Sequence, residues 1–315
     1  MIITDYLQAQ PGPQWEYALQ CGVTSATIRL PEDPAFDPCD PSHWAAVCQR
    51  FRDRGIRPLV VEPLPNALHD HIKAGDSRRD ECIEKAARML PIMAKEGITT
   101  LCYNFMAHVG WTRTRSDYKE RGGALVTGFD LDEYVPGEAA ITEGELWDNY
   151  TALMQALVPA AEKYGIRLAL HPDDPPLPKL GNVSRIMISL ENIRRALQIG
   201  NSPMAGVTLC QATYAMMGED LEQVVPALKD QIFFIHFRNA EGSKTRFRET
   251  FHDNGQLDMA RLLRLYRRCG VDVPIRVDHV PTLAGERNDQ PGYAALGRLY
   301  AIGYLRGLLD AIQQE

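Results

Sequence analysis

One pattern recurs eight times along this chain and restricts its possible folds more than any other feature. Short runs rich in Val, Ile, Leu, Phe and Tyr alternate with longer segments whose apolar residues recur with a helical period. Such an alternation predicts repeated strand–helix units around a parallel sheet. The predicted strands are Ile2–Leu7, Thr24–Leu30, Arg57–Glu62, Ile98–Asn104, Arg167–His171, Gly206–Cys210, Ile232–Arg238 and Pro274–His279.

The predicted helices follow these strands, and several of them end at a glycine. A glycine after the last helical turn adopts the left-handed conformation without a Cβ clash, so it marks a helix stop. The four junctions of this kind are Arg54-Gly55, Glu96-Gly97, Tyr164-Gly165 and Cys269-Gly270. The predicted helices are Gln14–Gln20, Pro41–Arg54, Arg78–Glu96, Glu143–Tyr164, Leu190–Ile199, Leu221–Leu228, Asp258–Cys269 and Tyr293–Gln314.

Eight such units within 315 residues predict an α/β fold of the (β/α)8 type, the TIM barrel. We expect residues 1–315 to form a single domain, because no Pro/Gly/Ser-rich linker or change of composition divides the chain. The long polar segment 107–142 is interpreted as a loop over the barrel mouth after the fourth strand. An open doubly wound sheet is the competing topology, but LQAQPGPQ after the first strand contains no GxGxxG phosphate turn.

Charge and cysteine content exclude several classes of protein. The chain has 34 basic and 41 acidic residues, a formal net charge of -7, and dispersed basic residues, so we expect no nucleic-acid partner. Seven cysteines without a CxxC pair favour a reducing cytoplasm. Asp5 interrupts the first apolar run, and no segment approaches the roughly 18 apolar residues that span a bilayer. We therefore expect neither export nor a membrane partner.

Metal-binding residue types stand at the ends of four consecutive predicted strands. In such a barrel, functional side chains lie where strands end and loops begin. The segments RLALHPDD, GVTLCQ, FFIHFRN and IRVDHV supply His171, Cys210, His236 and Asp278, respectively. Because neighbouring strands would direct two imidazoles, a thiolate and a carboxylate to one point, we predict a divalent-cation site. The ligand set alone leaves zinc, iron and manganese open.

Several long segments carry a family resemblance. They are VVEPLPNALHDHIKAG, CYNFMAHVGWTRTR, LALHPDDPP, GVTLC, IHFRN, FRETFHDNGQLDM and IRVDHV, which are spread over most of the chain. Two of them, CYNFM with the following WTRT and HPDDPP, are chemically unusual and therefore specific. On these segments the chain resembles the D-mannonate dehydratase family of the xylose-isomerase-like barrel superfamily.

The resemblance implies a metal and a reaction. His171, Cys210, His236 and Asp278 fall on the family's metal ligands, and the implied ion is Mn2+, with Fe2+ or Co2+ as substitutes. The implied enzyme is a lyase of hexuronate degradation that removes water from D-mannonate to give 2-keto-3-deoxy-D-gluconate. A divalent ion beside the substrate carboxylate and adjacent hydroxyl would stabilise the enediolate charge that develops as the C2 proton leaves.

His279 and Tyr293 fall where the family has an acid/base pair, and imidazole has a suitable unperturbed pKa for proton transfer. Which of the two is the acid stays open. Adjacent residues of a strand point to opposite faces, so His279 reaches the site only if the strand has ended and the backbone turns there.

Four residues are predicted to bind substrate. Arg113 and Arg238 could fork onto the substrate carboxylate, because guanidinium geometry suits it. Asn104 ends its strand, as does Glu62, and could contact sugar hydroxyls. His252 lies in the segment FRETFHDNG and could approach from the loop after strand seven. Asp173 and Asp174 could fix His171 indirectly, or could simply cap the loop before two prolines.

Two other functions remain open, because one barrel hosts many activities. One is a metal-dependent sugar or sugar-acid isomerase or epimerase that uses the same enediolate without losing water. The other is a sugar-acid binding protein in which Val280 or Tyr214 blocks the productive pose. The partner that we expect is a small sugar-acid substrate, and we expect a cytoplasmic homo-oligomer.

Overall fold

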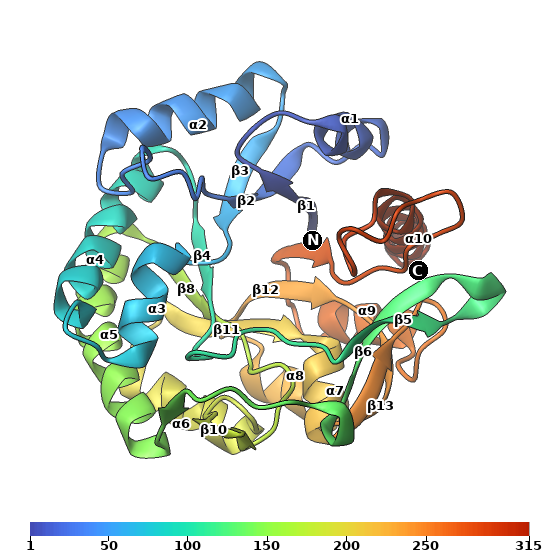
Figure 1. The fold of residues 1–315 in the computed structure, drawn as a ribbon. Helices are drawn as coiled ribbons and strands as arrows, with labels where there is room; N and C mark the ends of the chain where they lie inside the picture. The colour runs from blue at the N-terminus through green and yellow to red at the C-terminus, as the bar shows by residue number, and fades with distance from the viewer. Residues whose placement is uncertain (315) are drawn as a thin grey trace.

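The computed structural model describes residues 1–314, and its centre is a closed barrel of eight parallel strands (Figure 1). The strand order around the barrel is β1-β15-β12-β11-β8-β4-β3-β2. The barrel strands are β1 (Ile2–Gln8), β2 (Ser25–Arg29), β3 (Arg57–Val61), β4 (Thr100–Tyr103), β8 (Arg167–Leu170), β11 (Ala205–Cys210), β12 (Ile232–Phe237) and β15 (Pro274–Val277). Each overlaps one predicted strand, so the predicted TIM barrel is confirmed.

Helices surround the barrel as an outer layer (Figure 1). They are α1 (Pro13–Gln20), α2 (Pro41–Asp53), α3 (Asn66–Ala74), α4 (Arg79–Lys95), α5 (Glu143–Tyr164), α6 (Leu190–Gly200), α7 (Gln211–Met217), α8 (Leu221–Leu228), α9 (Met259–Arg268) and α10 (Ala295–Gln313). The short helices α3 and α7 were not predicted, because nine and seven residues give little periodic signal. Helix α10 begins after Tyr293, which leaves this residue in a loop.

Apolar residues on both faces of the strands produce two layers of core. Ile28, Val61 and Leu168 face the helices and belong to the large cluster between sheet and helices, whereas Val60 and Phe234 belong to a smaller cluster within the barrel. Burial on both faces explains why the strands read as continuous apolar runs. The four glycines predicted to stop helices all have positive φ, between 68° and 79°.

The segment 107–142 contains secondary structure that the loop prediction missed. A four-stranded antiparallel sheet, ordered β13-β14-β6-β5, includes a hairpin from this segment. Its strands are β5 (Arg115–Lys119), β6 (Leu125–Asp130), β13 (Ala240–Ser243) and β14 (Arg246–Glu249); a smaller sheet contains β7 (Ala140–Ile141), β9 (Lys179–Leu180) and β10 (Asn182–Ser184). The hairpin turn uses Gly122 and Gly123, both at positive φ.

The hairpin is joined to the loop that follows β15. Leu125 and Thr282 exchange backbone hydrogen bonds of 3.0 and 2.8 Å, and Val280 N donates to Gly292 O at 2.8 Å. These bonds hold the segment from His279 to Tyr293 against the hairpin. The extra sheet thus supports one rim of the barrel mouth.

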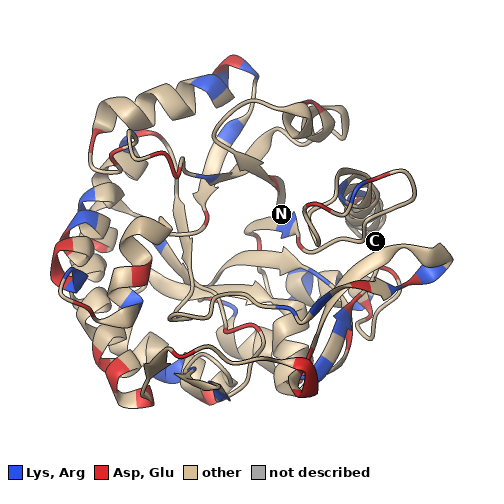
Figure 2. Ribbon diagram, in the orientation of Figure 1, with Lys and Arg blue, Asp and Glu red and all other residues tan. Residues whose placement is uncertain are grey.

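The surface has no single dominant charge. Figure 2 shows acidic and basic residues interspersed over the outer helices. Among residues 1–314, none of the helices combines the length and apolar character needed to cross a bilayer.

Candidate active site

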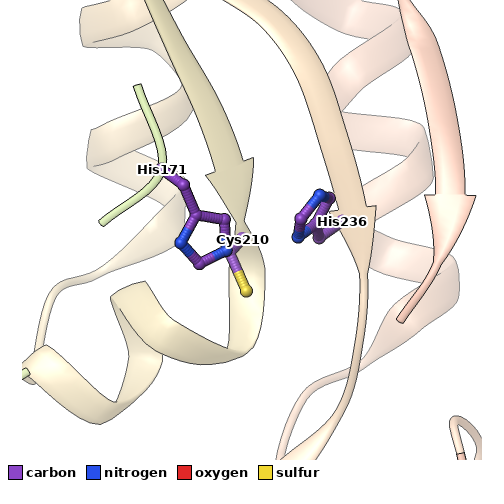
Figure 3. A group of neighbouring side chains, drawn as sticks. All are labelled: His171, Cys210 and His236. Atoms are coloured by element: carbon purple, nitrogen blue, oxygen red, sulfur yellow. The ribbon is translucent and has the colours of Figure 1, made fainter. Parts of the chain in front are cut away.

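Three of the four predicted metal ligands lie together at the carboxyl ends of adjacent strands. Cys210 ends β11, His236 lies in β12, and His171 directly follows β8. One ligand atom from each lies within 4.8 Å of the other two. Figure 3 shows His171 beside Cys210, with His236 on the neighbouring strand. The parallel register explains this grouping, since Cys210 pairs directly with His236.

Both imidazoles direct a nitrogen atom towards the group. His171 Nδ1 donates to Pro172 O at 2.6 Å, which leaves Nε2 as the unprotonated nitrogen. Both nitrogens of buried His236 lack a hydrogen-bond partner among the described residues. Its Nε2 lies 3.1 Å from Glu62 Oε1 and its Nδ1 3.5 Å from Asp278 Oδ2. Burial and Arg276 act to lower the pKa of His236, but Glu62 and Asp278 outweigh them and hold it well above its usual range. A bound cation would take the place of the proton that these carboxylates favour on the ring.

The surroundings of Cys210 favour its thiolate form. Burial acts to raise its pKa, but Arg238 and the two neighbouring histidines outweigh this, so the pKa of the Cys210 thiol is held well below its usual range. Arg238 Nη1 lies 3.5 Å from the sulfur, and the Thr213 hydroxyl donates to it at 3.1 Å. Because the thiolate is the form that binds metals, this environment fits a metal ligand.

Asp278 lies beside the group of three ligands, next to His236. It follows β15, and its Oδ1 accepts a hydrogen bond of 2.8 Å from Arg276 Nη1. The group whose ligand atoms all lie within 4.8 Å of one another is His171, Cys210 and His236, without Asp278. The structure therefore brings three predicted ligands together and keeps the fourth beside them.

A second group, Glu62, Cys102 and His236, also has ligand atoms within 4.8 Å of one another. Glu62 is bound by Arg276, with contacts of 2.8 and 3.0 Å. Burial raises the pKa of the Cys102 thiol to about 11, so this sulfur stays protonated at neutral pH. The donor chemistry therefore fits a divalent ion better at Cys210 than at Cys102.

A cavity of about 160 Å³ opens beside these ligands. Its lining includes His171, His236, Asp278, His279 and Tyr293, which the sequence analysis had assigned to metal binding or catalysis. Asn104 also borders it and accepts a hydrogen bond from Met106 N at 3.1 Å. Val280 and Tyr214 are buried outside this lining, so the blockage considered for a binding protein has no support in their positions.

His279 meets the geometric condition for reaching the site. Strand β15 ends at Val277, and His279 has a φ of 38°, which turns its side chain into the cavity. Its Nδ1 lies 3.1 Å from Glu249 Oε1. Because a carboxylate only accepts hydrogen bonds, Nδ1 carries the proton and Nε2 is the basic nitrogen. The Tyr293 ring meets the imidazole edge-on at 5.5 Å, and burial raises the pKa of its phenol.

Arg113 and Arg238 lie in a buried ion-pair network outside the cavity lining, which differs from their predicted contact with substrate. Arg113 forms a bidentate pair with Asp174 at 2.8 and 2.9 Å. Arg238 contacts Glu249 at 2.7 and 2.8 Å and Asp174 at 2.6 Å. The physical reason is that buried guanidinium groups require anionic partners, and these two carboxylates occupy the donors that a substrate would need.

His252 and Asp173 also have structural partners. His252 is fully buried, lies outside the cavity lining and donates from Nε2 to Phe237 O at 2.7 Å, whereas the sequence analysis expected it to bind substrate. Asp173 Oδ2 accepts hydrogen bonds of 3.0 Å from the backbone of Ile186 and Met187. Asp173 thus fixes the loop that follows His171.

His252 gives a testable pH dependence of stability. Burial lowers its pKa to about 4, below the roughly 6.5 of an unfolded histidine. Between these values the unfolded state binds more protons, so the free energy of unfolding falls as the pH falls, by up to ~1.4 kcal/mol per pH unit. Buried His69 shifts in the same direction. We expect His252→Gln, which can still donate to Phe237 O, to reduce this slope in urea unfolding of metal-free protein. An unchanged slope would contradict the assignment.

Several residues of the site were missed by the sequence analysis. Glu249 ends β14 and contacts both Arg238 and His279, while Trp111 covers His279 with a ring separation of 4.7 Å. Both stand in segments that carry the family resemblance, which was the signal available. Arg276 and Arg29 border the cavity from β15 and β2; Arg276 stands in the segment IRVDHV, whereas Arg29 lies in none of the segments that carry the resemblance.

Known proteins that are similar to this chain belong to one family. The family model described as D-mannonate dehydratase (UxuA) matches residues 14–139 and 133–315. "Mannonate dehydratase 2" of Halalkalibacterium halodurans is 32% identical over 300 residues, covering 85% of this chain and 86% of its own length.

Two solved structures have the same fold. A mannonate dehydratase from Streptococcus suis serotype 2 has a TM-score of 0.90 at 26% identity, covering 100% of this chain and 95% of its own. A xylose isomerase domain protein from Planctomyces limnophilus shares the fold at a TM-score of 0.65 and 13% identity, covering 100% and 99% of the two chains. The matching family model spans nearly the whole barrel, and the chain therefore belongs to the D-mannonate dehydratase family.

Proposed function

We propose that this chain converts D-mannonate to 2-keto-3-deoxy-D-gluconate and water, with His171, Cys210, His236 and Asp278 holding a divalent ion. The family is one of metal-dependent hydro-lyases. The observation that carries the proposal is the grouping of two imidazoles and an ionised thiol within 4.8 Å, beside a cavity that His279 and Tyr293 border. We propose Mn2+ as the ion, with Fe2+ or Co2+ as substitutes.

The bound ion would act as a Lewis acid on the substrate carboxylate and its neighbouring hydroxyl. The protein supplies the proton transfers. In our proposal, His279 Nε2 accepts the C2 proton, because Glu249 holds the proton of the ring on Nδ1. The Tyr293 phenol, kept protonated by burial, donates to the C3 hydroxyl, which leaves as water. The C3–O bond breaks as the C2=C3 bond forms, and the resulting enol tautomerises to the 2-keto acid.

The substrate-binding predictions become a more specific proposal. Asn104 borders the cavity and contacts a sugar hydroxyl. Arg113 and Arg238 position other groups and do not contact substrate. Arg238 keeps Cys210 ionised, and both arginines hold Glu249 in position for His279. The buried position of His252 supports a structural role beneath β12.

Glu249 offers a test of this positioning role. Glu249→Gln keeps the size of the side chain but removes the charge that orients His279 and balances the two arginines. We expect kcat for D-mannonate to fall at least ~10-fold, as for other partners that orient active-site groups, with little change in KM. Metal content should stay near that of the wild type. A variant with full kcat, or one whose only defect is metal loss, would contradict the role.

Turnover by purified protein tests the proposed function. With Mn2+ and D-mannonate, we expect a 2-keto-3-deoxy acid, detected by its periodate–thiobarbiturate colour. An epimerase would instead release a new aldonate, which chromatography separates from D-mannonate, and a binding protein would release neither. Either of the latter results would replace the proposed reaction.

We also propose a single catalytic domain over residues 1–315, a cytoplasmic location and assembly as a homo-oligomer. The interspersed surface charges support the expectation of no nucleic-acid partner (Figure 2). Light scattering on the purified protein measures its oligomeric state.

A further inference from the structure

A second cavity continues from the one at the metal ligands. It has a volume of about 530 Å³ and shares Tyr6, Arg29, Trp111 and Tyr293 with the smaller cavity. An outer chamber therefore adjoins the place where chemistry is proposed. The outer chamber extends beyond the metal ligands and His279, none of which lines it.

The lining of the outer chamber is unusual for an acidic protein. It contains two arginines, Arg29 and Arg298, and four glutamines, but no Asp or Glu among the described residues. The whole chain, in contrast, carries 41 acidic residues against 34 basic ones. Arg298 Nη2 is already paired with Asp5, which lies outside this lining. Arg29 and the amide groups therefore remain as the donors that favour an oxygen-rich, negatively charged ligand.

Arg29 stands on the opposite side of the mouth from the metal ligands. It ends β2, which lies four strands from β11 in either direction around the eight-stranded barrel. The inner cavity nevertheless reaches both Arg29 and the histidines His171 and His236. A linear ligand with one end at the metal would therefore extend its other end towards Arg29.

The Arg29 guanidinium has unused hydrogen-bond donors. Nη1 donates to the Tyr6 hydroxyl at 3.0 Å, and Nη2 is paired with Glu32, whose side chain is 61% exposed. Of the five N–H donors of a guanidinium, the other three have no acceptor among the described residues. Arg276, the other arginine of the inner cavity, is already occupied by Glu62 and Asp278.

We propose that Arg29 and the outer chamber form a second anion subsite, which binds the far end of acyclic sugar acids that carry a second terminal oxyanion. The inference rests on the proposed function, since it places the first carboxylate at the metal. It extends the substrate range from D-mannonate to dianionic relatives. The second oxyanion can belong to a terminal carboxylate or to a terminal phosphate ester, and the chamber has room for either.

The test uses two probes, D-mannarate and 6-phospho-D-mannonate, with D-mannonate as the reference. For each, kcat/KM is measured with metal-loaded enzyme, and binding is measured by calorimetry. We expect the wild type to bind and dehydrate at least one dianion. Arg29→Gln should lower the ratio of kcat/KM for that dianion to kcat/KM for D-mannonate by at least about tenfold, or ~1.4 kcal/mol. The probe whose ratio falls shows whether the subsite binds a terminal carboxylate or a terminal phosphate.

A second pair of variants separates charge from folding. Gln290→Glu places a carboxylate in the chamber lining at an exposed position and should lower the same ratio about threefold, because solvent screens part of the repulsion. Gln223→Glu, exposed on α8 and outside the chamber, makes the same charge change and should leave the ratio unaltered.

The outcomes distinguish the subsite from the reaction. If the wild type dehydrates D-mannonate but neither binds nor converts a dianion, the subsite is refuted while the proposed function stands. Equal loss on all substrates in Arg29→Gln also refutes it. If D-mannonate itself is not converted, the proposed function fails, and calorimetry with the dianions still decides whether the subsite exists.

Discussion

Cys210→Ser is expected to abolish both metal retention and dehydration. The hydroxyl of serine stays protonated at neutral pH, so the site loses its thiolate, which its surroundings hold ionised. Mutation of groups that merely support metal ligands typically lowers affinity 10- to 100-fold, and removal of a ligand should exceed ~100-fold. Metal analysis after dialysis, together with turnover of D-mannonate, measures both effects.

Cys102→Ser is the matched control. Its thiol is equally buried but has a raised pKa, and serine can keep the contact with Thr208 Oγ1, which lies 3.2 Å from the sulfur. This variant should retain the metal. Metal loss in Cys102→Ser with retention in Cys210→Ser would instead favour the group formed by Glu62, Cys102 and His236. His236→Ala should lose the metal under either assignment, because His236 belongs to both groups.

Tyr293→Phe is expected to keep the metal and lose rate. The substitution removes only the phenolic oxygen, while the ring contacts with Tyr6 and His279 can persist. General acid catalysis contributes about 10²- to 10⁴-fold, and we expect kcat to fall within that range with normal metal content. Single-turnover kinetics would show that the loss lies in the chemical step.

Tyr164→Phe serves as its control, since Tyr164 is an exposed tyrosine at the end of α5, before β8 begins, whereas the site lies where β8 ends. It should match the wild type in rate. If Tyr293→Phe also ran at full rate, the phenol would have no role in proton transfer, and His279 or water would have to protonate the leaving hydroxyl.

The sequence predicted the barrel because its evidence is local. Each strand is buried on both faces and is followed by a helix, so apolar runs and glycine stops identify eight units without knowledge of their neighbours. The hairpin of β5 and β6 could not be found in this way. Strand β5 is mainly polar, RSDYK, and it forms because β6 pairs with the distant strand β14.

The same distinction applies to the site. His171, Cys210 and His236 were predictable together because ends of adjacent parallel strands share one edge. The partners of Arg113 were not, since Asp174 and Glu249 lie 61 and 136 residues away. A sequence shows that an arginine could bind a carboxylate, but it does not show that the protein already supplies one.

The central claim is that one ion binds between His171, Cys210 and His236, with Asp278 beside them. Anomalous diffraction from a crystal grown with Mn2+ measures this directly. We predict one strong peak within ~2.0–2.4 Å of the Cys210 sulfur and of one nitrogen from each histidine. A peak centred on Glu62 and Cys102 instead, or no peak at a metal occupancy confirmed by elemental analysis, would contradict the account.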